Sequence, residues 1–183
     1  MSMIHWNFYR RLVPLVLLLC IAMLFAGCFT TKFTLGKLED AKVDLGYVGN
    51  WQSTDDSGKK LTLIVRNIDN HRYYVEWTDD KDAGKGAQRF TGHVSPVAGV
   101  GFAQLKPLTA DGTIEENNMI LRVGMKDGSL TIQDLKDEFF KDKTISSDDD
   151  LRKLIEANVE NKAMYDGDMM KFTRLPEEEH GVK

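Results

Sequence analysis

Apolar and polar residues alternate along most of the chain from Tyr47 onward. Runs in which every second residue is apolar are separated at short intervals by turn residues, such as the pair Asp69-Asn70. A period of two is typical of β-strands that bury one face. The apolar residues that mark these predicted strands are Leu61, Leu63, Val65, Tyr73, Val75, Trp77, Phe90, Val94, Phe102, Leu105, Met119, Leu121, Val123, Met125, Leu130 and Ile132.

Turn residues between the runs predict how consecutive strands connect. The sequence Lys126-Asp127-Gly128-Ser129 predicts a tight hairpin, because Asp-Gly favours the turn that matches the twist of paired strands. Residues 95–101 (SPVAGVG) separate two strands, and their glycines predict a sharp bend or bulge. Residues 79–86 (DDKDAGKG) are too charged and too rich in glycine for a buried segment, so they predict an exposed loop.

One amphipathic helix is predicted late in the chain, beginning at Ser147. The Ser147 hydroxyl can cap the first turn, and the aspartates at 148–150 lie where the helix dipole favours negative charge. The apolar residues of this helix fall on one stripe, which predicts that it packs on another element; they are Leu151, Leu154, Ile155 and Val159.

A short last strand, from Met169 to Leu175, is expected after the turn Asp166-Gly167. Residues 176–183 are polar and predict a flexible tail. Seven or eight antiparallel strands with one late amphipathic helix indicate a mainly β domain over residues 47–175, built as a small up-and-down barrel.

The N-terminal residues have the organisation of a secretion signal. Arg10 and Arg11 precede an uncharged, strongly apolar run from Leu12 to Gly27, interrupted early by Pro14. A positive region followed by an apolar region is typical of a signal peptide. The run is shorter than the ~20 residues that a helix needs to span a bilayer, which favours cleavage over permanent insertion.

The residues at the end of this run, Leu24 to Cys28 (LFAGC), resemble the lipobox of bacterial lipoproteins. The resemblance implies cleavage between Gly27 and Cys28 and transfer of diacylglycerol, with palmitate-like acyl chains, to the Cys28 thiol. Residues 1–27 would then be the signal peptide. An uncleaved N-terminal helix with an incidental cysteine, and ordinary secretion with cleavage elsewhere, are the alternatives.

Residues 28–46 follow as a lipidated tether. They mix Thr, Lys, Asp and Gly with scattered apolar residues and show no sustained period. Fully extended, such a segment reaches at most ~60 Å, so the domain is expected to stand clear of the bilayer.

Composition excludes several classes of function for the mature chain. Removal of residues 1–27 takes away two arginines and no acidic residue, which leaves 22 basic against 28 acidic side chains. Binding to nucleic acid, or to anionic lipid through a polybasic patch, needs clustered Lys or Arg, so neither is expected. Because Cys20 lies in the signal and Cys28 carries lipid, no thiol remains for a disulfide, a metal or a nucleophile.

The start and the end of the predicted barrel resemble lipocalins and their calycin relatives. Gly49-Asn50-Trp51 is similar to the Gly-x-Trp that opens those barrels, and the helix before the last strand is similar to their order of elements. In that superfamily the tryptophan closes the barrel floor and an arginine from the end of the barrel covers it. The resemblance implies that Trp51 and Arg174 form this closing pair, by a cation–π contact; an ordinary core aromatic is the alternative for Trp51.

The polar residues give little sign of catalysis. His71 and His93 have no Cys, His or Glu beside them at metal-ligand spacing, so no metal site is expected. The carboxylates of residues 79–82 lack the order of a calcium loop, and residues 84–86 are too short for a phosphate cradle. Ser146 and Ser147 are better explained by helix capping, and no acid/base pair stands out. We therefore expect neither a cofactor nor enzymatic activity.

Two functions remain open. In the first, the barrel is a binding module for a small apolar or lipid-like ligand, with an interior lined by Tyr73, Trp77, Phe90, Met119 and Met125. In the second, the barrel is filled by the same side chains, and its outside binds a protein or cell-wall partner in the envelope. Either barrel is compatible with eight strands. The lipid on Cys28 implies a place in the cell envelope, at the outer membrane if the organism has two membranes.

Overall fold

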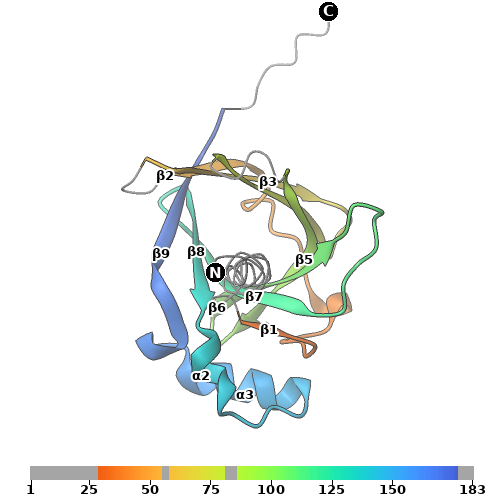
Figure 1. Cartoon of the computed structure of the whole chain (residues 1–183), viewed down its shortest axis with the longest axis vertical. Coiled ribbons are helices and arrows are strands. Elements are labelled where there is room, and N and C mark those ends of the chain that lie inside the picture. Colours follow the sequence, from red (N-terminus) through yellow and green to blue (C-terminus); the bar gives the residue numbers. More distant parts are fainter. Residues whose placement is uncertain (1–28, 55–57, 81–85, 177–183) are drawn as a thin grey trace, which may run out of the picture.

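The computed structural model describes residues 29–54, 58–80 and 86–176, and within these ranges eight antiparallel strands close into a barrel (Figure 1). Each strand pairs with the next along the chain, and β9 returns to β2 through the pairs Trp51–Arg174 and Gln52–Thr173. The strands are β2 (Gly49–Thr54), β3 (Lys60–Asn67), β4 (Tyr73–Asp79), β5 (Gln88–Val97), β6 (Val100–Leu108), β7 (Asn118–Lys126), β8 (Ser129–Leu135) and β9 (Tyr165–Arg174). The predicted mainly β, up-and-down barrel is confirmed.

Helices lie outside the barrel, between β8 and β9 (Figure 1). The predicted helix is α3 (Asp148–Asn158), and the Ser147 hydroxyl accepts a hydrogen bond from the Asp150 amide at 3.1 Å, as its capping role requires. A short helix that the sequence pattern did not predict, α2 (Asp137–Lys141), precedes it. Short 3-10 turns, η2 (Leu38–Asp40) and η4 (Lys162–Met164), complete the helical elements of the described ranges.

The core has an inner and an outer part, because neighbouring residues of a strand point to opposite faces. Inside the barrel, Trp51, Leu63, Leu121 and Phe172 are among the most buried side chains. Outside it, residues such as Phe102 and Ile120 face the helices. The outer cluster contains Phe29, Leu35, Val97, Phe102, Ile120, Leu135, Phe140, Leu151, Ile155, Met164 and Tyr165.

The predicted stripe of α3 contributes to this outer cluster. Leu151 and Ile155 are fully buried in it, and Leu154 and Val159 pack against it. The helix therefore covers outward-facing apolar residues that would otherwise meet water, and it leaves the barrel interior to the strands.

Residues 29–46 differ most from the prediction. Phe29 and Leu35 are buried, and Thr30–Thr31 form a short strand, β1, that pairs with β7. The segment therefore lies on the barrel as part of the fold, which corrects the expectation of a soluble tether that lets the domain stand clear of the bilayer. Its apolar residues show no period because they meet partners on several different elements.

Two connections also differ in detail. The β5–β6 turn consists of Ala98 and Gly99, both at positive φ, so most of the segment 95–101 belongs to the strands themselves. Asp166 and Gly167 lie inside β9, where the register with β8 is irregular between Ile132 and Asp134. An irregularity of this kind bends a strand without ending it. The Asp127-Gly128 hairpin is confirmed, with φ of 51° and 73°.

Gly92 marks a close approach of β5 to β6. A Cβ atom placed there would lie 2.0 Å from the Gln104 carbonyl oxygen, which is backbone and cannot move aside alone. We expect Gly92→Ala to lower the free energy of unfolding by about 3 kcal/mol or more, measured by urea denaturation, because overpacking against backbone is not relieved by a rotamer change.

Gly124 provides the matched control for this substitution. A Cβ atom on Gly124 meets the Thr131 hydroxyl oxygen at 3.3 Å and no backbone atom within 4 Å. We expect Gly124→Ala to change the stability by less than ~1 kcal/mol. Equal losses in the two variants would contradict the tight β5–β6 approach.

Candidate functional site

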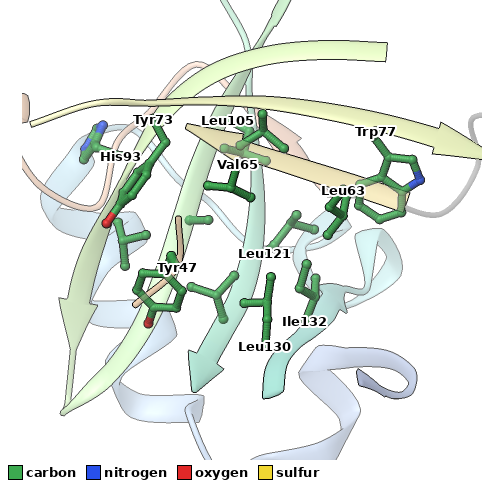
Figure 2. Close-up of a pocket in the computed structure, with 14 residues that line it drawn as sticks. Tyr47, Leu63, Val65, Tyr73, Trp77, His93, Leu105, Leu121, Leu130 and Ile132 are labelled. Atoms are coloured by element: carbon green, nitrogen blue, oxygen red, sulfur yellow. The ribbon is translucent and has the colours of Figure 1, made fainter. Parts of the chain in front are cut away.

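The barrel interior contains a partly open apolar cavity of about 50 Å³ (Figure 2). Its exposed inner surface is entirely apolar. Tyr47 and Tyr73 lie toward one side of the cavity and Trp77 toward the other (Figure 2). The lining residues are Tyr47, Leu63, Val65, Tyr73, Val75, Trp77, His93, Val94, Ala103, Leu105, Leu121, Val123, Leu130 and Ile132.

The two tyrosines do not make the cavity polar. The Tyr73 hydroxyl accepts a hydrogen bond from the Asp44 amide at 2.6 Å and lies 3.2 Å from the Asp44 carbonyl oxygen, to which it can donate. Burial raises the pKa of Tyr73 to about 12, so the hydroxyl stays neutral at physiological pH. The ring of Tyr47 meets that of Tyr73 edge-on, with centroids 6.2 Å apart. The N-terminal segment thus satisfies the Tyr73 hydroxyl and leaves its ring to the interior.

One end of the barrel is closed by Trp51 and Arg174. The Arg174 guanidinium lies 4.3 Å from the centroid of the Trp51 ring, and the indole N–H donates to the Tyr47 carbonyl oxygen at 2.9 Å. The two terminal guanidinium nitrogens donate to the carbonyl oxygens of Val48 and Gly46, each at 2.7 Å. The structure therefore brings together the two residues for which the lipocalin resemblance implied contact.

Gly49 lies directly beneath this pair, which explains its residue type. A Cβ atom at this position would be 2.6 Å from the Arg174 Nη1 atom and 3.5 Å from the Trp51 Nε1 atom. A side chain would displace the guanidinium from the ring. The absence of a side chain at Gly49 therefore leaves room for the guanidinium over the Trp51 ring.

Of the residues expected to line the interior, Tyr73 and Trp77 line this cavity. Phe90 is buried in the inner cluster and Met119 packs against it, but neither borders the cavity. Met125 is 37% exposed, beside the β7–β8 hairpin. The alternating pattern continues to Met125, but the strand there has already reached the rim of the barrel. Tyr47 and His93, which do border the cavity, carry no sequence signal for that position.

His93 belongs to a buried polar cluster beneath the N-terminal segment. The Gln104 side-chain oxygen accepts a hydrogen bond from the Leu35 amide at 2.6 Å. The Gln104 side-chain nitrogen donates to the Ser95 hydroxyl at 2.9 Å. The same nitrogen lies 2.9 Å from His93 Nε2, and Nε2 lies 3.2 Å from the Gly36 carbonyl oxygen. Nε2 accepts from Gln104 when it is unprotonated and donates to Gly36 when it is protonated, so it makes one of the two bonds at a time.

Burial lowers the pKa of His93, with a smaller contribution from the charge of Lys106 and a partial offset from the Gly36 contact. The unfolded chain therefore takes up a proton near pH 6.5, where the folded chain does not. We expect the stability to be unaffected by His93 above about pH 7 and to fall as the pH drops below ~6.5, by at most ~1.4 kcal/mol per pH unit. Urea denaturation between pH 5 and 8 measures the free energy of unfolding as a function of pH. This free energy should fall less steeply with decreasing pH in a His93→Asn variant. An unchanged pH dependence in the variant would contradict the role of His93.

The other polar candidates have structural partners. His71 Nδ1 lies 2.6 Å from the Ala41 carbonyl oxygen, so this half-buried ring holds the N-terminal segment. Asp79 pairs with Lys59 at 2.5 Å, and most of the loop 79–86 lies outside the described residues. Among the described residues no group of three or more His, Cys, Asp or Glu side chains could hold a metal ion.

Comparison with protein-family models, curated proteins and solved structures finds no match. No helix in the described ranges is both long enough and apolar enough to cross a membrane. The geometry of the cavity and of the closing pair therefore carries the functional argument.

Proposed function

We propose that this chain is a membrane-anchored lipoprotein whose barrel binds a small apolar group in its interior. The observation that carries the binding proposal is the cavity of about 50 Å³, whose inner surface is entirely apolar. Burial of hydrocarbon in an apolar cavity is favourable, by about 0.8 kcal/mol for each CH₂ group removed from water. The anchor is proposed from the residues 24–28, which resemble a lipobox.

The cavity sets the size of the ligand. Pockets for drug-sized molecules have volumes of ~300–1,000 Å³, so 50 Å³ holds only a few carbon atoms. The ligand is therefore the end of one alkyl chain or a comparably small apolar group, and a whole lipid does not fit inside. We also propose kinship with the lipocalins, supported by Gly49, Trp51 and Arg174 at the closed end.

We further propose that the barrel binds its ligand without catalysing a reaction. The cavity offers no polar surface to polarise a substrate, and the one imidazole that borders it, His93, is engaged by Gln104 or Gly36. General acid–base catalysis requires such a group within reach of the substrate.

A filled barrel that serves as an envelope interaction protein is the second candidate, and the small cavity volume favours it. In that case the interior residues only stabilise the fold, and a protein or cell-wall partner binds the outer surface.

Octanoate, a single eight-carbon chain, separates the two candidates. The experiment uses a chain that begins at Phe29. We expect octanoate to change its tryptophan fluorescence, because Trp77 lines the cavity. Native mass spectrometry should show one octanoate per chain. Ala103 also lines the cavity, so Ala103→Leu should weaken binding at least ~10-fold by filling the space, whereas Leu in place of the exposed Ala163 should not. Absence of saturable binding, or equal binding by both variants, would favour the filled barrel.

A further inference from the structure

The first residue after the proposed lipid site is fixed on the barrel. Phe29 is 5% exposed, and its ring stacks on Phe140 with centroids 3.9 Å apart. Its amide donates to the Leu135 carbonyl oxygen at 3.2 Å, and its carbonyl accepts from the Ile120 amide at 3.4 Å. Because consecutive Cα atoms are about 3.8 Å apart, a lipid on Cys28 is attached here without slack.

Phe29 marks one particular end of the barrel. It contacts Leu135 at the end of β8, Phe140 in α2 and Ile120 near the start of β7. Since the strands alternate in direction, this end also carries the β2–β3, β4–β5 and β6–β7 connections. We call it the anchor end. The opposite end, which we call the closed end, carries the Trp51–Arg174 pair and the β3–β4, β5–β6 and β7–β8 turns.

The N-terminal segment first runs along β1 toward the anchor end, antiparallel to β7, and then turns and runs toward the closed end. It is held to the barrel along its length. The Leu35 amide donates to Gln104 at 2.6 Å, and the Val43 amide donates to the Asn70 carbonyl oxygen at 3.0 Å, in the β3–β4 turn. At the start of α3 the Asp148 carboxylate accepts from the amide and the hydroxyl of Thr34, at 2.8 and 2.9 Å. Because of these contacts, the N-terminal segment cannot act as a flexible linker that lets the barrel rotate relative to the lipid.

We infer that the acyl chains on Cys28 hold the anchor end of the barrel against the bilayer surface and point the Trp51–Arg174 end into the aqueous space. This inference rests on the proposed lipid anchor and adds the orientation of the domain. The partner surface is a phospholipid leaflet. Exposed carboxylates at the anchor end, on Glu115, Glu116, Asp137 and Glu138, keep this end at the leaflet surface and out of the hydrocarbon.

Two exposed isoleucines provide probe positions at the two ends. Ile114 lies in the β6–β7 connection at the anchor end, and Ile68 lies in the β3–β4 turn at the closed end. Strands of eight to ten residues, tilted in the barrel, separate such positions by about 20 Å along its axis. With Cys20 removed in the signal and Cys28 acylated, a new cysteine is the only free thiol of the mature chain.

The experiment uses the full chain, lipidated and reconstituted into phosphatidylcholine vesicles, with a fluorophore on Ile114→Cys or Ile68→Cys. A quencher attached to lipid headgroups is expected to quench the probe at position 114 several-fold more than the probe at 68. Stronger quenching at 68 would show that Leu45 and Ile68, exposed at the closed end, face the membrane, and would overturn the inference; equal quenching would also overturn it.

A linker variant tests the cause of the orientation. Twelve Gly/Ser residues inserted between Cys28 and Phe29 should make the quenching of the two probes nearly equal, because the barrel can then rotate. An unchanged difference would show that another contact orients the domain. Flotation of the protein with the vesicles reports separately on the anchor: a chain that does not float contradicts the proposed lipidation itself, whereas a floating chain with the reverse quenching contradicts the orientation alone.

Discussion

A Cys28→Ser variant is expected to lose all incorporation of labelled palmitate. The lipid is proposed to be attached through the Cys28 thiol, and a serine hydroxyl does not form the same thioether. In the proposed mature chain, which begins at Cys28, no other cysteine is present that could take over this role. Since stable membrane attachment needs two or more acyl chains, the mature domain carrying serine should also leave the membrane fraction.

Cys20→Ser is the matched control, because it removes the other thiol of the chain from the middle of the proposed signal peptide. Labelling and membrane attachment should remain as in the wild type. Palmitate that persists in Cys28→Ser, or that is lost in Cys20→Ser, would contradict the position of the anchor.

Trp51→Ala is expected to lower the free energy of unfolding by about 3–5 kcal/mol, the range for truncation of a fully buried large aromatic residue. Trp51 has no exposed surface, its N–H is bonded to the Tyr47 carbonyl oxygen, and its ring carries the Arg174 guanidinium. Alanine would leave a cavity at the closed end and remove the ring beneath the cation. Urea denaturation followed by circular dichroism measures the loss.

Trp77 offers the comparison for this substitution. It is half-buried and meets Phe172 edge-on at 6.4 Å between centroids, but it borders the cavity and does not close an end of the barrel. We expect Trp77→Ala to cost clearly less than Trp51→Ala. A similar cost for both would mean that Trp51 is one core aromatic among others and that its pairing with Arg174 adds nothing.

The barrel and its late helix follow from local patterns, and the structure confirms both. The period of two gives the inward residues of β3, β4 and β7, and Asp127-Gly128 supplies the positive φ that its hairpin needs. The Ser147 cap is also local, because it bonds the Asp150 amide three residues on. The stripe of α3 is visible because its apolar residues recur with the period of a helix. Patterns of this kind are visible in the sequence because the physics that causes them acts between near neighbours.

The N-terminal segment could not be predicted in the same way. The partner of Phe29 is Phe140 and the partner of the Leu35 amide is Gln104, both far away along the chain. Without a period, these contacts leave no local trace, so the segment resembled a tether. The burial of His93 could not be predicted for the same reason, because the residues that cover it are distant along the chain.

The candidate site was predictable in part. Alternation placed Tyr73 and Trp77 inside the barrel, and both line the cavity. It also included Met125, which lies exposed at the rim, because a period of two does not show where a strand leaves the interior. The cavity volume depends on the packing of fourteen side chains from six strands and the segment before β2, and no sequence pattern fixes it.

The mass of the N-terminal peptide of the mature protein, isolated from membranes, tests the account most directly. We expect a peptide that begins at Cys28 and carries a diacylglycerol thioether, with or without a further acyl chain on its amino group. A membrane-bound protein whose first peptide contains residues from 1–27, or whose Cys28 is unmodified, would contradict the lipid anchor and the membrane orientation that follows from it.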